Sequence, residues 1–152
     1  MSATVNLIND AVKKYGKKRE NLLPVLQAVV REEKYLTEQA MIEIARALDI
    51  SSAEVYGTAS FYTFLDLKPR GKNVIRVCKT ITCYMKGKDD IIKAIEDRLK
   101  LKIGETTSDG KFSFLTTNCM GWCHKGPAML INDKVYTELT PKKAIAAIED
   151  CF

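Results

Sequence analysis

Residues 116–133 read "TTNCMGWCHKGPAMLIND", and this stretch places a cysteine pair directly after a β-prone run. Cys119 and Cys123 have three residues between them, and the only Trp and the only His of the chain, Trp122 and His124, stand on either side of Cys123. Cysteines at such short spacing are typical of metal centres and of redox-active thiols. The other cysteines of the chain decide which chemistry is expected.

A second cysteine pair lies upstream, in "VCKTITCYMKG". Cys78 and Cys83 have four residues between them, and 35 residues separate Cys83 from Cys119. Each pair follows a predicted strand, so two neighbouring strand ends would bring four sulfurs to one point, and four unrelated thiols are a poor explanation. One zinc ion needs four converging ligands, whereas a 2Fe–2S cluster needs two thiolates on each of two irons. The spacing leaves both metal centres open.

The single histidine restricts the types of iron–sulfur centre. A Rieske centre needs two histidine ligands, and His124 is the only histidine in the chain. The C-x2-C-x2-C run of bacterial ferredoxins and the plant-type spacing are both absent from the sequence. His124 beside Cys123 also does not predict a nucleophile pair, because catalytic Cys–His pairs come from separate parts of a chain. The fifth cysteine, Cys151, is interpreted as a spare thiol.

Residues 1–68 are predicted to form helices. The segments "NLLPVLQAVVREEKYL" and "TEQAMIEIARALDI" repeat apolar residues at helical spacing, and Thr37 is the expected cap of the second. Ser51 and Glu54 form a capping box for a further helix that runs into "VYGTASFYTFL". Gly57 is expected to bend or break that helix. This half of the chain therefore predicts an N-terminal α-helical bundle.

After "KPRGK" the spacing of apolar residues is no longer only that of helices, and short strand-like runs appear. The runs "NVIRVC", "KFSFLTT", "AMLIN" and "KVYTEL" read as strands, the last two joined by a hairpin at "ND", and "DDIIKAIEDRLK" reads as an amphipathic helix. Thr140 and Pro141 open a final helix. The order βαβββα is that of a thioredoxin-like fold. We therefore expect an α/β protein with a helical domain over 1–68 and a sheet domain over 69–152.

The chain carries no sign of a membrane span or of a secretion signal. No apolar run approaches the ~20 residues of a membrane helix, and the start "MSATVNLINDAVKK" lacks a basic leader followed by an apolar core. These features predict a cytoplasmic protein without direct membrane insertion. In that compartment five cysteines are more often thiolate ligands or free thiols than disulfides.

A nucleic-acid-binding function is a distant alternative. The segment "TEQAMIEIARALDISSAEVYGTASFY" scans like a helix-turn-helix, which beside an iron–sulfur domain would make a redox-sensing regulator. A recognition helix, however, needs Arg, Lys, Asn or Gln to read base edges. Residues 51–67 contain none of these, and Glu54 and Asp66 are their only charges. We therefore expect no nucleic-acid partner.

The cysteine order and its flanks resemble a known family. The flanks are "YGTASFYTFL", "ETTSDGKFSFLTTNCMGWC" and "GPAMLINDKVYTELTP". The family comprises the small 2Fe–2S subunits of NADH-linked redox complexes: the peripheral-arm E subunit of respiratory complex I, and relatives in NAD-dependent and electron-bifurcating hydrogenases and formate dehydrogenases. The likeness covers nearly the whole chain. It implies a thioredoxin-like 2Fe–2S ferredoxin domain behind an N-terminal α-helical bundle, with one 2Fe–2S cluster held by Cys78, Cys83, Cys119 and Cys123.

Other residues near the cysteines bear on the surroundings of the sulfurs. Trp122 and His124 depart from the small or apolar residues that the family leads us to expect there. Gly121 is expected to let the second loop fold closely, so that backbone N–H groups point at sulfur. Thr80 and Thr82 are either hydroxyl donors to sulfur or plain loop residues.

The resemblance also implies partners. The eight glycines form no GxGxxG or Walker pattern, so the sequence offers no visible site for NAD or flavin and no catalytic site of its own. A lone cluster passes single electrons, which implies a partner subunit that binds flavin and NAD(H) and carries iron–sulfur centres. The sequence favours a soluble NAD-linked hydrogenase, electron-bifurcating forms included, or a formate dehydrogenase complex. The E subunit of complex I is the alternative. The helical half is expected to dock the flavoprotein through "VYGTASFYTFL".

Overall fold

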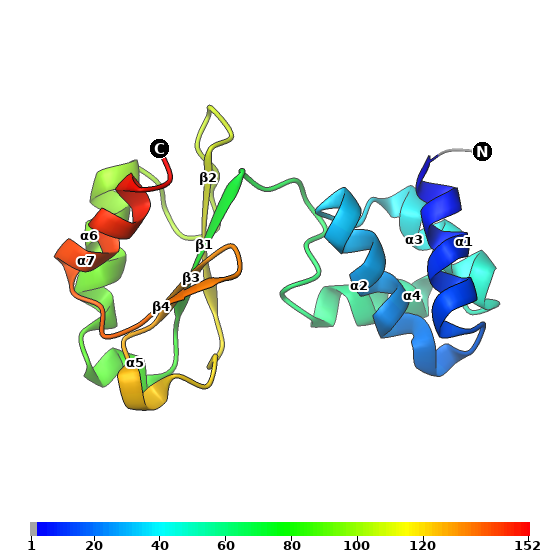
Figure 1. Cartoon of the computed structure of the whole chain (residues 1–152), viewed down its shortest axis with the longest axis horizontal. Helices are drawn as coiled ribbons and strands as arrows, with labels where there is room; N and C mark the ends of the chain where they lie inside the picture. The colour runs from blue at the N-terminus through cyan, green and yellow to red at the C-terminus, as the bar shows by residue number, and fades with distance from the viewer. Residues whose placement is uncertain (1–2) are drawn as a thin grey trace. The chain divides into compact units, whose positions relative to one another are not determined.

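The computed structural model of the protein describes residues 3–152. Met1 and Ser2, the first two residues of the predicted helical half, lie outside the described residues. The chain divides into two compact units, with the division between Pro69 and Arg70. In Figure 1, helices α1 to α4 make up the N-terminal unit, and the sheet with its helices makes up the C-terminal unit.

The N-terminal unit is a small helical bundle. Its helices are α1 (Ala3–Tyr15), α2 (Leu22–Glu33), α3 (Glu38–Leu48) and α4 (Ser52–Phe61), with a 3-10 turn, η1 (Arg19–Asn21), before α2. The apolar residues that recur at helical spacing face a common interior and are fully buried at Val25, Leu26, Val29, Ile44 and Val55. The predicted helical bundle is confirmed.

Side-chain caps start two of these helices where the sequence predicts. Thr37 Oγ1 accepts a hydrogen bond from the Ala40 N–H at 3.0 Å, and Ser51 Oγ accepts one from the Glu54 N–H at 3.2 Å. Each hydroxyl satisfies an N–H that has no partner within the helix. The Glu54 carboxylate pairs with Arg19 of η1 instead of returning to Ser51. The hydroxyl half of the predicted capping box is thus confirmed.

The expected break at Gly57 is wrong. Helix α4 continues through Gly57 and ends at Phe61, after which the chain leaves the helix at residues 62–65. A glycine inside a helix costs only about 1 kcal/mol relative to alanine. Val55 and Ala59, on either side of Gly57, are both fully buried in the bundle core. Their packing holds the helix through the glycine.

The C-terminal unit is built on a mixed sheet in the order β2-β1-β3-β4. Strand β1 runs parallel to β2 and antiparallel to β3, and β3 is antiparallel to β4. Helices α6 and α7 lie side by side against the sheet (Figure 1). The bounds are β1 Asn73–Cys78, β2 Phe112–Thr117, β3 Met129–Ile131, β4 Lys134–Tyr136, α6 Lys88–Leu99 and α7 Pro141–Glu149.

The predicted βαβββα order and the thioredoxin-like ordering are confirmed. The hairpin closes at Asn132–Asp133, since Ile131 pairs with Lys134. Thr140 caps α7 by accepting the Lys143 N–H at 3.2 Å. Two short elements come in addition: helix α5 (Ile81–Met85) and the 3-10 turn η2 (Cys123–Lys125), one in each cysteine loop. They are too short to leave a hydrophobic period in the sequence.

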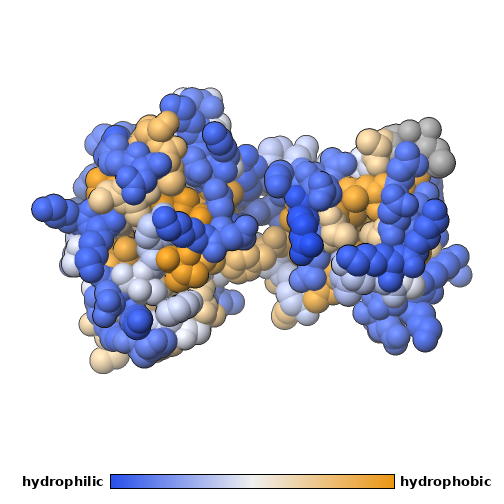
Figure 2. Space-filling view, viewed as in Figure 1, coloured by the Kyte–Doolittle hydropathy of each residue, from blue (hydrophilic) through white to orange (hydrophobic). Residues whose placement is uncertain are grey.

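Polar residues cover most of the visible face of both units, with smaller apolar areas between them (Figure 2). Across residues 3–152, no helix combines the length and the apolar character that crossing a membrane requires. Two groups of large apolar side chains are nevertheless exposed. The α4 aromatics are Tyr56, Phe61, Tyr62 and Phe64, and the cysteine-loop apolars are Ile81, Tyr84, Met85 and Trp122.

Candidate metal centre

The parallel pairing of β1 with β2 brings the two cysteine loops together. Cys78 is the last residue of β1 and stands opposite Thr117, the last residue of β2. Cys119 follows two residues later, and the Lys79 N–H bonds to the Thr117 carbonyl at 2.9 Å. Parallel strands end at the same edge of a sheet. The loops that carry the two cysteine pairs therefore start side by side at this edge.

The four sulfurs of these loops are associated two by two. Cys119 Sγ lies 3.1 Å from Cys123 Sγ, and the thiols of Cys78 and Cys83 are hydrogen-bonded to each other. Cys123 also interacts electrostatically with Cys78 and Cys83, so the two pairs face one another. Cys78 and Cys83 are buried, Cys123 is half-buried and Cys119 is exposed. Two thiolates on each of two irons is the ligand arrangement of a 2Fe–2S cluster.

Within residues 3–152, no three Cys, His, Asp or Glu side chains are gathered as they would be around a single metal ion. The thiols form two facing pairs, Cys78 with Cys83 and Cys119 with Cys123. The fifth cysteine lies elsewhere: Cys151 Sγ donates to the Ala147 carbonyl at 3.4 Å, and its own carbonyl accepts from Asn73 at 3.4 Å. Asn73 and Cys78 are the two ends of β1, and a six-residue strand separates its ends by roughly 16 Å.

Hydrogen-bond donors surround the sulfurs. Thr80 Oγ1 lies 3.1 Å from Cys78 Sγ, and the Thr82 hydroxyl bonds to the Cys123 sulfur. Both threonines are therefore partners of sulfur, which settles the alternative that the sequence left open. The Gly121 N–H donates to Cys119 Sγ at 3.3 Å. Gly121 has a φ of 85°, a left-handed conformation that glycine adopts without a steric penalty.

Two further donors come from the main chain. The Met120 N–H bonds to the Cys78 sulfur, and the Ala128 N–H bonds to the Cys83 sulfur. The first of these contacts links the second cysteine loop to the first. A sequence motif cannot reveal such donors, because any residue other than proline carries a backbone N–H. Only the folded positions of the loops identify them.

These surroundings separate the thiol pKa values. Burial acts to raise the pKa of the Cys78 thiol, but hydrogen bonds from Thr80, Cys83 and Met120 outweigh it, and the net pKa lies below the ordinary value. Burial raises the pKa of Cys83, and the hydrogen bond with Cys119 raises the pKa of Cys123. Thiolate is the form that binds metal. Cys78 is thus the thiol of these three that most readily takes the ligand form.

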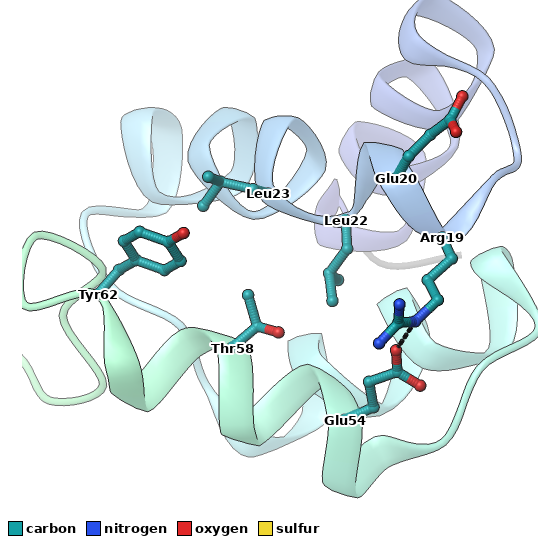
Figure 3. A pocket seen from close by; sticks show the side chains of 7 residues that line it. All are labelled: Arg19, Glu20, Leu22, Leu23, Glu54, Thr58 and Tyr62. Carbon is teal, nitrogen blue, oxygen red and sulfur yellow. Dashed lines mark hydrogen bonds and ion pairs between the residues drawn. The ribbon is translucent and has the colours of Figure 1, made fainter.

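The N-terminal unit contains a pocket of its own, of about 420 Å³. Figure 3 shows the Arg19–Glu54 ion pair at one end, the Tyr62 ring at the other, and Leu22 and Leu23 on the α2 side. The pocket is lined from η1, α2 and α4, and one of the α4 aromatics forms part of its wall. It contains no cysteine and is separate from the sulfur site.

The sequence matches the thioredoxin-like 2Fe-2S ferredoxin family over residues 8–152. It is 39% identical over 148 residues to the E subunit of the NADH-quinone oxidoreductase of Rickettsia bellii, an alignment that covers 95% of this chain and 89% of the relative. The E subunit of the same enzyme from Buchnera aphidicola (Acyrthosiphon pisum) is 37% identical over 145 residues, covering 95% of this chain and 90% of the relative.

Similarity extends to hydrogenases. The NADP-reducing hydrogenase subunit HndA of Solidesulfovibrio fructosivorans is 37% identical over 132 residues, covering 85% of this chain and 77% of the relative. The crystal structure of an NAD+-reducing NiFe-hydrogenase in its H2-reduced state aligns with a TM-score of 0.74 at 25% identity, over 86% of this chain and 22% of that chain.

The sulfur site agrees with this family assignment. Two facing pairs of thiols, each supplied with hydroxyl or N–H donors, fit a centre with two thiolates on each iron. The resemblance seen in the cysteine spacing and in its flanks is thereby confirmed, as is the thioredoxin-like α/β fold. The chain belongs to the thioredoxin-like 2Fe–2S ferredoxin family, and its cofactor is one 2Fe–2S cluster.

Proposed function

We propose that the chain is the one-electron-transfer subunit of an NAD(H)-linked oxidoreductase, working next to a subunit that binds flavin and NAD(H). The observation that carries the proposal is that four thiols, in two pairs that face each other, lie where β1 and β2 end side by side. The ligands in this proposal are Cys78, Cys83, Cys119 and Cys123.

The surroundings of the thiols suit electron transfer. A bound 2Fe–2S cluster supplies one-electron redox chemistry, and its potential depends on hydrogen bonds to sulfur and on solvent exposure. The Thr80 hydroxyl and the Gly121 N–H lie against ligand sulfurs. Donors of this kind stabilise added negative charge and so raise the potential. Burial of Cys78 and Cys83 excludes water on one side, and the exposed Cys119 leaves the other side open to a partner.

The surface around the exposed side fits a protein partner. Ile81 is 68% exposed, Met85 is 79% exposed and Trp122 is 37% exposed, all on the cysteine loops. The loop residues 79–88 and 118–128 contain four lysines, Lys79, Lys86, Lys88 and Lys125, and no acidic residue. Clustered exposed apolar side chains indicate contact with another protein. The basic rim favours a partner surface that is acidic.

Two kinds of complex are candidates. Our first proposal is a soluble NAD-linked hydrogenase, electron-bifurcating forms included, or a formate dehydrogenase. Likeness to a NADP-reducing hydrogenase subunit and to an NAD+-reducing hydrogenase supports the hydrogenase form. The E subunit of complex I is the second, and relatives with that name at 37% and 39% identity support it equally well. Co-purification from the native source distinguishes them: a hydrogenase or formate dehydrogenase catalytic subunit supports the first, and a membrane quinone module supports the second.

The isolated chain with its cluster is expected to show no NADH oxidation with an artificial electron acceptor, because the proposal gives it no catalytic site of its own. Addition of the co-purifying flavoprotein should allow NADH to reduce the cluster, seen as bleaching of its visible absorption. Sustained NADH turnover by the chain without flavoprotein would contradict the proposed role.

We also propose that the N-terminal unit docks the flavoprotein through the α4 aromatics. Phe61 is 76% exposed and Phe64 is 51% exposed, whereas the bundle core is already filled by buried residues that include Val55 and Leu65. The pocket bounded by Tyr62 lies beside these rings and offers a recess for a partner side chain. Such exposed rings contribute strongly when a partner buries them.

Phe61→Asp and Phe64→Asp test this docking surface. Both variants should keep their far-UV circular dichroism and cluster spectrum, because the rings contribute little to the core, yet at least one should fail to co-purify with the flavoprotein. Gln27→Asp introduces the same charge at an exposed position of α2 and is the matched control. Normal co-purification of both phenylalanine variants, or unfolding of both, would overturn the docking proposal.

A further inference from the structure

One lysine bonds to the main chain of a cysteine from each pair. The Lys86 N–H donates to the Cys83 carbonyl at 3.2 Å, at the end of α5. The Lys86 ammonium donates to the Cys123 carbonyl at 3.0 Å and lies 3.5 Å from the His124 carbonyl, in η2. Lys86 therefore connects the short helix that carries one sulfur with the short turn that carries another.

The stem of the same side chain packs where the two loops meet. A Cβ placed on Gly126 would lie 3.3 Å from Cys83 Sγ, 3.5 Å from Lys86 Cδ and 3.6 Å from the Cys123 carbonyl oxygen. Gly126 is thus surrounded by atoms of Lys86, Cys83 and Cys123. Because Gly126 has no side chain, the Cys83 sulfur can lie close to it. The lysine covers this contact with its methylenes while its charged end reaches the carbonyls of η2, as amphipathic side chains commonly do.

The two carbonyl contacts suit a cation. The Cys123 carbonyl accepts a long bond of 3.5 Å from the Gly126 N–H in its own turn, and its second lone pair is open to the Lys86 ammonium, as lysine side chains commonly bond to carbonyls of helical turns. A 2Fe–2S cluster held by four thiolates would carry a net negative charge, which makes a positive charge favourable beside it. Both effects favour the bridging position of Lys86 over free movement in solvent.

We propose that Lys86 is a positioning residue that sets the separation of the two cysteine pairs and thereby retains the cluster. It acts through the main chain of Cys83 and Cys123 and is not itself a ligand. The proposal rests on the ligand set assigned under the proposed function. Its consequences are slower loss of iron and a higher reduction potential, because the fixed loops resist opening and the nearby charge stabilises the reduced form.

Three variants of the full chain with its cluster separate the effect of the Lys86 bridge on iron retention from the effect of a nearby positive charge on the potential. K86M removes the ammonium but keeps the length of the stem, K86R keeps a cation with N–H donors, and K125M removes an exposed lysine charge from the other cysteine loop. The readouts are the rate of iron loss to a chelator, followed by visible absorption, and the midpoint potential from a redox titration. Far-UV circular dichroism checks that each variant is folded.

K86M is expected to lose iron roughly 10–100-fold faster than the unmodified chain, which is the range for residues that orient metal ligands. K86R should restore a slow rate, and K125M should lose iron at the unmodified rate while its potential falls. K86M losing iron no faster than K125M would overturn the proposal, and so would K86R losing iron as fast as K86M. A wrong ligand set is a separate outcome, since the cluster would then survive replacement of a proposed ligand cysteine.

Discussion

Replacement of any one of Cys78, Cys83, Cys119 or Cys123 by Ala is expected to abolish or remodel the 2Fe–2S spectrum, whereas Cys151→Ala should leave it unchanged. The four thiols lie in two facing pairs at one end of β1 and β2, so under the proposed ligand set each variant would remove half of the thiolates from one iron. The Cys151 thiol donates to the Ala147 carbonyl of α7, and the Cys151 carbonyl accepts from Asn73 at the far end of β1.

The measurement is the metal and sulfide content of anaerobically purified protein. The unmodified chain and Cys151→Ala should contain two irons and two acid-labile sulfides per chain, with a one-electron paramagnetic signal after reduction. Each ligand variant should lose iron and sulfide together. Stoichiometric zinc without sulfide in native protein would contradict the assignment, and so would an unchanged spectrum in any of the four ligand variants.

Phe114→Ala is expected to destabilise the C-terminal unit by about 3–5 kcal/mol, the usual cost of removing a fully buried phenylalanine side chain. Phe114 is in the middle of β2, pairs with Ile75 of β1 and has no exposed surface. A loss of this size is a large part of the stability of an ordinary domain. Because β2 leads directly into the loop of Cys119, the variant should also retain its cluster poorly.

Urea unfolding followed by Trp122 fluorescence measures this loss, since the only tryptophan of the chain lies in the C-terminal unit. Leu115→Ala is the matched control. Its side chain is the next along β2 and is only half-buried, so it should cost clearly less. Equal stability losses for Phe114→Ala and Leu115→Ala would show that β2 does not pack as described.

Local features of the chain were predictable because their causes are local. The caps at Thr37 and Thr140 depend on a hydroxyl and an N–H three residues later, and both form as expected. The hairpin at Asn132–Asp133 and the alternating core positions of Phe112 and Phe114 are likewise set by a few neighbouring residues. Gly57 failed as a local signal because Val55 and Ala59, on either side of it in α4, are buried in the bundle core, and their packing keeps the helix continuous.

The surroundings of the cysteines required the fold. Cys78 and Thr117 are far apart in the sequence and are brought opposite each other only by the pairing of β1 with β2. The bond from the Met120 N–H to the Cys78 sulfur and the reach of Lys86 to the Cys123 carbonyl cross between the two loops. The exposure of the Phe61 ring likewise depends on which face of α4 the bundle covers.

The sequence by itself determined the order of helices and strands, the likeness to a 2Fe–2S family and the four cysteines expected as ligands. Hydrophobic period, caps and cysteine spacing all act over a few residues, so they can be read along the chain. Only the tertiary structure decided which donors meet each sulfur, which thiol has a lowered pKa, and that Lys86 spans the loops. These features depend on contacts between segments that only the packing of the sheet and its loops brings within hydrogen-bond distance.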